Sequence, residues 1–217
     1  MRASEDDDLV MALFLAAPGE LHGAPTPPQL TSALTSLHYA FGQHRKRCEL
    51  EDLFAQARAI QLSLLPNGRP RFGDFDIAAI SVPAQSVGGD LYDFIHVDHD
   101  TLGIAIADSS GHGLPAALQA RDVATGLRMG VARDFKLQRV VEKLNGIIHR
   151  SGLVSRFISL VFGELEKNGN FSYINAGHPP PLLRGPRGLS ELSVGGTLLG
   201  PQANAAYKLG FAHIDRG

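Results

Sequence analysis

Two aspartates at the ends of neighbouring apolar runs are the residues in this sequence best placed to do chemistry. Asp90 follows a glycine pair in "SVGGDLYDF", and Asp108 closes "LGIAIAD". If the segment between them folds as a hairpin around residues 98–101, its two ends lie side by side and the carboxylates converge. Two such charges repel each other, and a divalent cation makes their pairing favourable. Because Mg²⁺ and Mn²⁺ favour oxygen ligands, the sequence predicts a metal site here.

The small residues beside each aspartate have a role in the same hypothesis. Gly89 lets the backbone approach the site closely while Asp90 points into it. Gly111 belongs to the short turn "SSGHG", which leads from the second strand into a helix. In that turn His112 is either a proton donor or phosphate contact, or simply the cap of the turn. Taken alone, "GGD" and "SGHG" are each typical of ordinary turns, so the prediction depends on their order and strand-end placement.

Two other chemistries fit the same residues less well. Ser109 and Ser110 suggest a hydrolase nucleophile, but the chain lacks a G-x-S-x-G elbow and a readable Ser-His-Asp order. The "GGDLY" run is similar to the "GGD" turn of diguanylate cyclases. The acidic-aromatic continuation of that motif is missing, however, and Asp108 would have no role.

The elements that must position these residues alternate from strands to helices and back to strands. We expect strands at 75–82, 91–97, 102–108, 157–165 and 171–176, and helices at about 114–133 and 137–150. Asn168-Gly169 is a strong hairpin signal. This order predicts an α+β sandwich with an antiparallel sheet rather than a Rossmann-like repeat.

A long amphipathic segment precedes the sheet. Apolar residues recur at spacings of three and four from Leu30 to Leu64, with a basic interruption at residues 44–47, and Pro66-Asn67-Gly68 ends the helix. Such a face packs either on its own domain or on a partner helix, so residues 50–64 are a candidate homodimer contact. The first 28 residues end in the proline-rich "GAPTPPQL", which indicates a boundary or linker.

Composition excludes several classes of function. The chain has 217 residues with 20 Lys and Arg against 22 Asp and Glu, and this near balance gives no support for a nucleic-acid partner. Its single cysteine, Cys48, excludes an intrachain disulfide and suits the cytoplasm. The apolar run at residues 9–17 follows acidic residues 5–8 and is too short to span a bilayer. We therefore expect a cytoplasmic protein without a membrane segment.

Five stretches together resemble a known family. They are "ARAIQLSLLP", "PAQSVGGDLYDF", "IADSSGHGLPAAL", "LN" at residues 144–145 and "NAGHPPPLL", in this order. In combination they resemble the bacterial RsbU/SpoIIE branch of the metal-dependent PPM (type 2C) serine/threonine phosphatases. The resemblance runs from about Ala57 to the C-terminus and implies the PPM-type α/β-β/α sandwich.

The resemblance also implies a mechanism and partners. Asp90 and Asp108 match aspartates that hold a dinuclear Mn²⁺ or Mg²⁺ centre, and the carbonyl of Ser109 matches a further ligand. The metals bind the phosphate and activate a water that attacks phosphorus without a phospho-enzyme intermediate. Typical substrates are phosphorylated anti-anti-sigma (STAS-domain) proteins. Asn175 and His178, in "NAGHPP", match a loop near the site with a structural role favoured over direct catalysis.

The chain departs from the family pattern at its C-terminal end. Family members continue past residues 213–217 into a strand with a "TDG" motif whose aspartate is a core ligand, and no TDG occurs here. We therefore expect a truncated or degenerate PPM domain, with C-terminal strands missing and doubtful occupancy by two metals. This leaves a rival hypothesis, in which a catalytically impaired module binds a STAS-like partner or dimerises without turnover.

The expected organisation has three parts. Residues 1–47 form an N-terminal segment, which could be the remnant of a sensor domain, and residues 48–66 form a linker or switch helix. Residues 67–217 form the phosphatase domain.

Overall fold

A computed structural model describes most of the chain from residue 27 onward. The described ranges are 27–66, 68–83, 86–132, 136–151, 157–186 and 188–215. The chain divides into two compact units, Met1–Phe54 and Ala55–Gly217. The apolar run at residues 9–17 and the proline-rich boundary before residue 27 lie outside the described residues.

The first described element is the long helix α1, Pro27–Leu62. The helix predicted before the sheet is confirmed, but the basic stretch at residues 44–47 does not interrupt it. Arg45 and Arg47 each face a glutamate one turn later, with N–O distances of 4.0 Å to Glu49 and 2.8 Å to Glu51. Such i,i+4 pairs favour helix, which explains why the polar block stays helical. Within the described ranges, no helix is long and apolar enough to cross a membrane.

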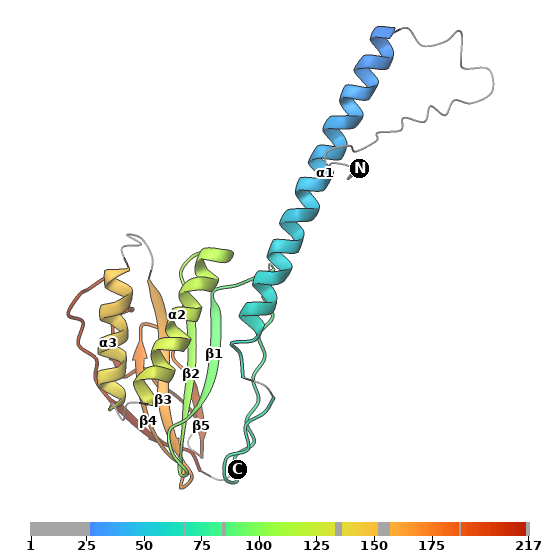
Figure 1. Cartoon of the computed structure of the whole chain (residues 1–217). Coiled ribbons are helices and arrows are strands. Elements are labelled where there is room, and N and C mark those ends of the chain that lie inside the picture. Colours follow the sequence, from blue (N-terminus) through green and yellow to red (C-terminus); the bar gives the residue numbers. More distant parts are fainter. Residues whose placement is uncertain are drawn as a thin grey trace. The chain divides into compact units, whose positions relative to one another are not determined.

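A six-stranded sheet forms the centre of the second unit (Figure 1). Its main strands are β1 (Asp90–His96), β2 (Thr101–Ser109), β3 (Ile158–Glu166) and β4 (Asn170–Ala176), joined in that order and all antiparallel. Two short strands, β7 (Gly195–Gly196) and β8 (Gly210–His213), pair with β4, the first parallel and the second antiparallel. The predicted hairpins at residues 98–101 and 167–170 are confirmed, the second with Gly169 at φ 95°.

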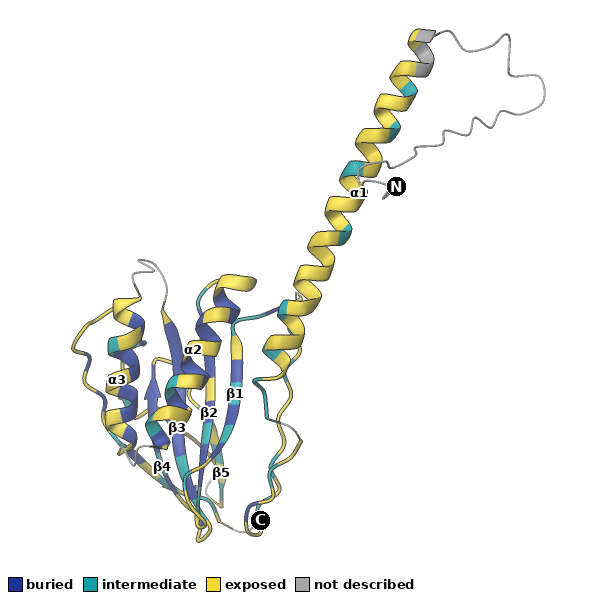
Figure 2. Cartoon of the chain, in the orientation of Figure 1, coloured by how far each residue is buried: buried dark blue, intermediate teal, exposed yellow. Residues whose placement is uncertain are grey.

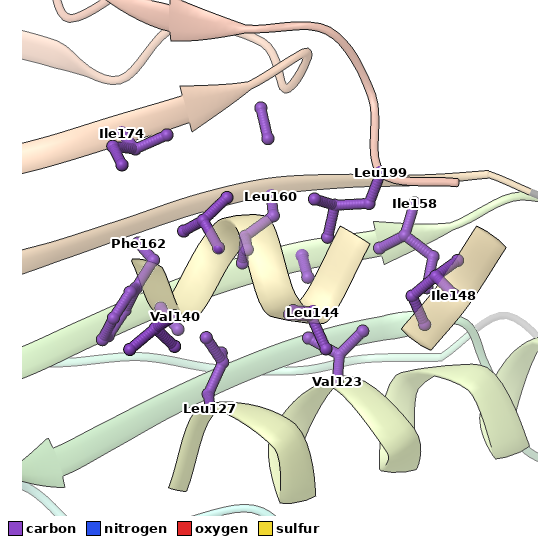
Figure 3. Close-up of a cluster of buried hydrophobic side chains, with 14 of the residues drawn as sticks. Val123, Leu127, Val140, Leu144, Ile148, Ile158, Leu160, Phe162, Ile174 and Leu199 are labelled. Carbon is purple, nitrogen blue, oxygen red and sulfur yellow. The ribbon is translucent and has the colours of Figure 1, made fainter. Parts of the chain in front are cut away.

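Helices α2 (Leu114–Val131) and α3 (Leu137–Arg150) cover one face of this sheet (Figure 1). Val123 and Leu127 of α2, Val140 and Leu144 of α3 and Phe162 of β3 meet in one buried cluster (Figure 3). Figure 2 shows that the buried positions of both helices face the sheet while their outer positions are exposed. Both predicted helices are thus confirmed, and their packing fixes the helix-facing side of β1 to β4.

The other face of the sheet carries a smaller apolar cluster. Leu102, Leu165, Phe171 and Tyr173 of the sheet pack there with Phe72 and Leu192. A two-stranded sheet of β5 (Leu182–Gly185) and β6 (Gly188–Glu191) lies beside this cluster, and Leu183 of β5 packs against it. The α+β architecture with predominantly antiparallel strands is therefore confirmed.

The strand predicted at residues 75–82 is wrong. This segment contains no assigned strand, and the isolated bridge between Phe72 and Phe75 is the pairing found there. Ile80 and Val82 are 83% and 79% exposed. An apolar, β-branched run forms a strand only where a neighbour supplies ladder hydrogen bonds, and sequence pattern alone does not specify that neighbour.

Candidate functional site

The two predicted aspartates lie directly opposite each other at one end of the β1–β2 hairpin. Asp90 pairs with Asp108, and Asp108 pairs in turn with Ser159 of β3. The residues following Asp90 and preceding Asp108, Leu91 and Ala107, belong to the helix-side core. Since side chains alternate along a strand, the three cross-strand neighbours lie on the opposite face, in one row across three strands.

The close approach of Asp90 and Asp108 is electrostatically unfavourable. Burial, followed by the negative charge of Asp90 and a hydrogen bond with it, raises the pKa of Asp108. The shift has this direction because Asp108 loses hydration and faces a second carboxyl group. Two facing carboxyl oxygen sets form a hard, anionic donor set of the kind that Mg²⁺ and Mn²⁺ select. The residues present therefore fit a divalent cation.

Gly89 makes the close approach that its position predicts. A Cβ atom at this position would lie 2.6 Å from the carbonyl oxygen of Ser109 and 3.2 Å from the Cβ of Ala116. The Ser109 amide donates to the Gly89 carbonyl at 3.2 Å, so the two backbones are in direct contact. Only a residue without a side chain permits this contact beside Asp90.

The hydroxyl of Ser109 points away from the carboxylate row. It is buried and donates to Oε1 of Gln119 on α2 at 2.6 Å. Its hydrogen bond is therefore used to anchor the loop to α2. This geometry gives no support to a serine nucleophile, and it leaves the backbone carbonyl as the Ser109 group to consider as a ligand.

Ser110 anchors the start of the loop between β2 and α2 by hydrogen bonds, and Gly111 in its middle has open space around it. Ser110 exchanges two hydrogen bonds with the backbone of Phe157: its amide donates to the carbonyl, and its Oγ accepts from the amide, each at 2.9 Å. Gly111 has φ 95°, and a Cβ atom there would have no neighbouring atom within 4 Å, while Gly113 has φ 71°. His112 is exposed on this loop.

Asn175 and His178 lie on the far side of β3 from Asp108, at the end of β4 and in the loop that follows it. Asn175, on β4, is buried and brackets the backbone of His178, accepting from its amide at 2.8 Å and donating to its carbonyl at 2.9 Å. The ring nitrogen Nδ1 of His178 lies 2.7 Å from Oγ of Ser159. Burial lowers the pKa of His178, while the charges of Asp108 and Asp90 oppose that shift. The structure thus brings Asp90, Asp108, Ser159 and His178 together.

Among the residues that the structure describes, no group of three or more His, Cys, Asp or Glu side chains forms a metal cluster. The row therefore offers two carboxylates rather than a complete ligand cage. Mg²⁺ is commonly held by one or two carboxylates with waters and substrate phosphate oxygens, so two carboxylates are enough for such an ion.

The contacts that secure the segment before Asp90 were not predicted from the sequence. Gln61, near the end of α1, donates from Nε2 to the Gly88 carbonyl and accepts from the Gly88 amide at 3.1 Å, as a neighbouring strand would. Arg58 donates to the carbonyl of Ser86 at 3.2 Å. The end of α1 thus holds the chain two residues before Asp90. The signal in the sequence is a polar side chain within an apolar helix end.

A half-buried ion pair connects β1 to α2 and to the chain after α1. Asp93 is 1% exposed and accepts two hydrogen bonds from Arg128, at 2.7 and 3.0 Å. Arg128 also donates to the carbonyl of Leu64 at 2.6 Å. Because bidentate arginine–carboxylate bonds are directional, this contact fixes the relative position of three segments around the site.

Fold and site together define a class: a PP2C-like α+β domain with paired carboxylates at adjacent strand ends. The PP2C domain of SiaA from Pseudomonas aeruginosa is similar in structure, with a TM-score of 0.62 and 16% identity over 78% of this chain and 69% of that one. This likeness supports the fold. The profile of the family "Stage II sporulation protein E (SpoIIE)" matches residues 98–215, and the chain belongs to this family.

Curated relatives are consistent with the family assignment. Phosphoserine phosphatase RsbU of Bacillus subtilis (strain 168) is 29% identical over 172 residues, covering 78% of this chain and 51% of that protein. Protein IcfG of Synechocystis sp. is 30% identical over 200 residues, covering 79% of this chain and 31% of that protein. The chain thus spans about half, or less, of the length of these relatives.

Proposed function

We propose that this chain is a metal-dependent protein phosphatase that hydrolyses phosphoserine or phosphothreonine on a signalling protein. The observation that carries the proposal is the cross-strand pair Asp90–Asp108. Burial and the facing charge of Asp90 raise the pKa of Asp108, and a cation relieves this cost. The relative named phosphoserine phosphatase RsbU supports the same reaction class.

In this proposal Asp90 and Asp108 would hold Mn²⁺ or Mg²⁺, with the Ser109 carbonyl as a further ligand, and the family resemblance implies two metal ions in the complete site. A cation held by these residues would lower the pKa of a coordinated water and neutralise charge on the phosphoryl oxygens. In the balanced reaction the water oxygen forms the new P–O bond, the ester P–O bond breaks, and the side-chain oxygen leaves with a proton as serine or threonine. Inorganic phosphate is the other product.

We further propose that the phosphoprotein is an anti-anti-sigma protein of the STAS class, in the cytoplasm. Membership of the SpoIIE family and the RsbU relative support this choice. In this scheme residues 67–217 are the phosphatase domain, residues 48–66 are the switch helix, and residues 1–47 are an N-terminal segment. Residues 50–64 mediate homodimerisation, which the exposure of Leu50, Leu53 and Ile60 supports.

A second candidate function follows from the absence of a three-residue metal cluster among the described residues. In this alternative, the chain is a PPM-fold module that binds a STAS-like partner without turnover. The two candidates differ in one measurable property, namely whether phosphate is released.

The test measures phosphate release from a phosphoserine peptide and from a phosphorylated STAS-domain protein of the same genome, with Mn²⁺ or with EDTA. The matched control is Asp108→Asn, which removes one charge while keeping the side-chain shape. Release that requires Mn²⁺ and is lost in the variant supports the phosphatase. No release in any condition, together with retained binding of the STAS protein, refutes the phosphatase and supports the module.

A further inference from the structure

Contacts from Asn175 and Gly177 fix the backbone of His178 in the loop after β4. Asn175 is 4% exposed, and its side-chain amide brackets His178, accepting from the backbone N–H and donating to the backbone carbonyl. Gly177 has φ 70°, and a Cβ atom there would lie 2.8 Å from the side chain of Leu198. Substitution at this glycine would therefore be both strained and crowded. The position of the His178 backbone is thus fixed from two sides.

Ser159 fixes the ring of His178 in turn. Ser159 lies directly across from Asp108, and its Oγ is 2.7 Å from Nδ1 of His178 but 3.5 Å from the Asp108 carbonyl oxygen. The 2.7 Å contact fits two arrangements: Nδ1 accepts from the hydroxyl, or Nδ1–H donates to Oγ while the hydroxyl donates to the Asp108 carbonyl. We assign the first arrangement, because the 3.5 Å contact to that carbonyl is at the limit of a hydrogen bond. With Nδ1 as acceptor, the neutral ring carries its hydrogen on Nε2. The free edge of the ring is therefore a hydrogen-bond donor.

The ring of His178 lies beside Ser159, on the face of the sheet that carries Asp90 and Asp108. Strands lie about 4.8 Å apart, so Ser159 is one strand from Asp108 and two strands, about 10 Å, from Asp90. His178 is only partly buried, and the charges of Asp108 and Asp90 act on its pKa. A donor here does not complete a cation site, because cations require lone pairs. It suits an anion held by that cation.

We propose that His178 donates a hydrogen bond from Nε2 to a phosphoryl oxygen of the substrate, and that Ser159 and Asn175 are positioning residues for this contact. The inference rests on the proposed function, because it needs a phosphoryl group at the Asp90–Asp108 site. His178 then contacts the substrate directly, while Ser159 and Asn175 orient His178. A neutral donor adds no charge, so it binds phosphate without competing with the cation.

The test compares His178→Ala and His178→Gln in the full chain, with Mn²⁺ present. Two readouts are used: kcat/KM for p-nitrophenyl phosphate, and the dissociation constant of inorganic phosphate by calorimetry. A hydrogen bond to a charged group corresponds to about a 10- to 100-fold effect, so we expect that loss in kcat/KM and phosphate affinity for His178→Ala. The amide N–H of His178→Gln restores most of both. Manganese affinity stays within about twofold, because a ring that donates is not a ligand.

Two further variants separate substrate contact from a general structural effect. Ser159→Ala should reduce kcat/KM less than His178→Ala, and the double variant should be no worse than His178→Ala, because residues acting through one contact are not additive. The matched control is His149→Ala on α3, since His149 also makes one Nδ1 hydrogen bond, to the Gly200 carbonyl at 2.7 Å. We expect that variant to bind phosphate as the unmodified chain does.

The outcomes divide cleanly. Unchanged phosphate affinity in His178→Ala, additive losses in the double variant, or a parallel fall in manganese affinity would each overturn the inference. If the unmodified chain shows no turnover but binds phosphate in a His178-dependent way, the proposed activity fails and the His178 contact stands. If the unmodified chain binds no phosphate in saturating Mn²⁺, the inference fails.

Discussion

Replacing Asp108 with asparagine should raise the thermal stability of the metal-free protein while removing its stabilisation by Mn²⁺. Burial and the facing charge of Asp90 raise the pKa of Asp108. The folded protein therefore keeps that proton to higher pH than the unfolded chain, so its stability falls as pH rises from the ordinary carboxyl pKa to the shifted one. At pH 7 the full cost is present, and the neutral amide removes it.

The magnitude is modest because the burial of Asp108 is only partial and its side chain remains exposed to solvent. Two unit charges 4 Å apart interact by about 1 kcal/mol in water, and exposed pairs are worth about 0.2–1 kcal/mol, so we expect a gain of about 0.5–1 kcal/mol. For a domain of this size that corresponds to an increase in Tm of about 1–4 °C. Saturation of the unmodified chain with Mn²⁺ at 100 times Kd should add about 2.7 kcal/mol.

Differential scanning calorimetry gives the Tm of the unmodified chain and of Asp108→Asn at pH 7 and pH 4, in EDTA and in MnCl₂. The Asp108→Asn gain in EDTA should be present at pH 7 and shrink at pH 4, and MnCl₂ should leave the variant's Tm nearly unchanged. Asp122→Asn, at an exposed carboxylate of α2, is the control that keeps its Mn²⁺ response. A lower Tm for Asp108→Asn in EDTA would show that the Asp108 charge does not destabilise the metal-free fold. An undiminished Mn²⁺ response would show that Asp108 is not a ligand.

Three other tests address separate parts of the structure. Gly89→Ala places a methyl group 2.6 Å from a backbone carbonyl oxygen and should lower the free energy of unfolding in urea by about 1–3 kcal/mol. Gly185→Ala, with open space around it, is the control and should change that free energy little. Equal losses in the two variants would contradict the close approach at Gly89. Tyr207→Phe removes a buried hydroxyl that has no hydrogen-bond partner among the described residues, and should stabilise the protein by about 1 kcal/mol; a loss of stability would reveal a partner. Leu53→Asp with Ile60→Asp should yield monomers by light scattering if this helix face mediates dimerisation, and an unchanged mass would discard that contact.

The helices and most of the sheet were predictable because each element buries one face of a simple pattern. The apolar spacing in α3 and the alternation in β1 and β2 identify the side that packs against the core. The hairpin turn at residues 98–101 then fixes which residues face each other. Convergence of Asp90 and Asp108 followed from this register, and the structure has it.

The parts that were missed depend on contacts between segments distant in the chain. The run at residues 75–82 has the composition of a strand, but composition does not say whether a neighbour will pair with it. The hydrogen bonds between Gln61 and Gly88, and those from Arg128 to Asp93, join residues 27 and 35 positions apart. No local pattern encodes such pairs, because they exist only once packing has brought the segments together.

The proposed site requires Asp90 and Asp108 to hold a divalent cation jointly, and calorimetric titration with Mn²⁺ measures that binding. The unmodified chain should take up Mn²⁺, Mg²⁺ should compete for the same site, and Asp90→Asn or Asp108→Asn alone should weaken the affinity at least about tenfold. If the unmodified chain takes up no Mn²⁺, or if both variants bind it as tightly as the unmodified chain does, the paired carboxylates are not a metal site.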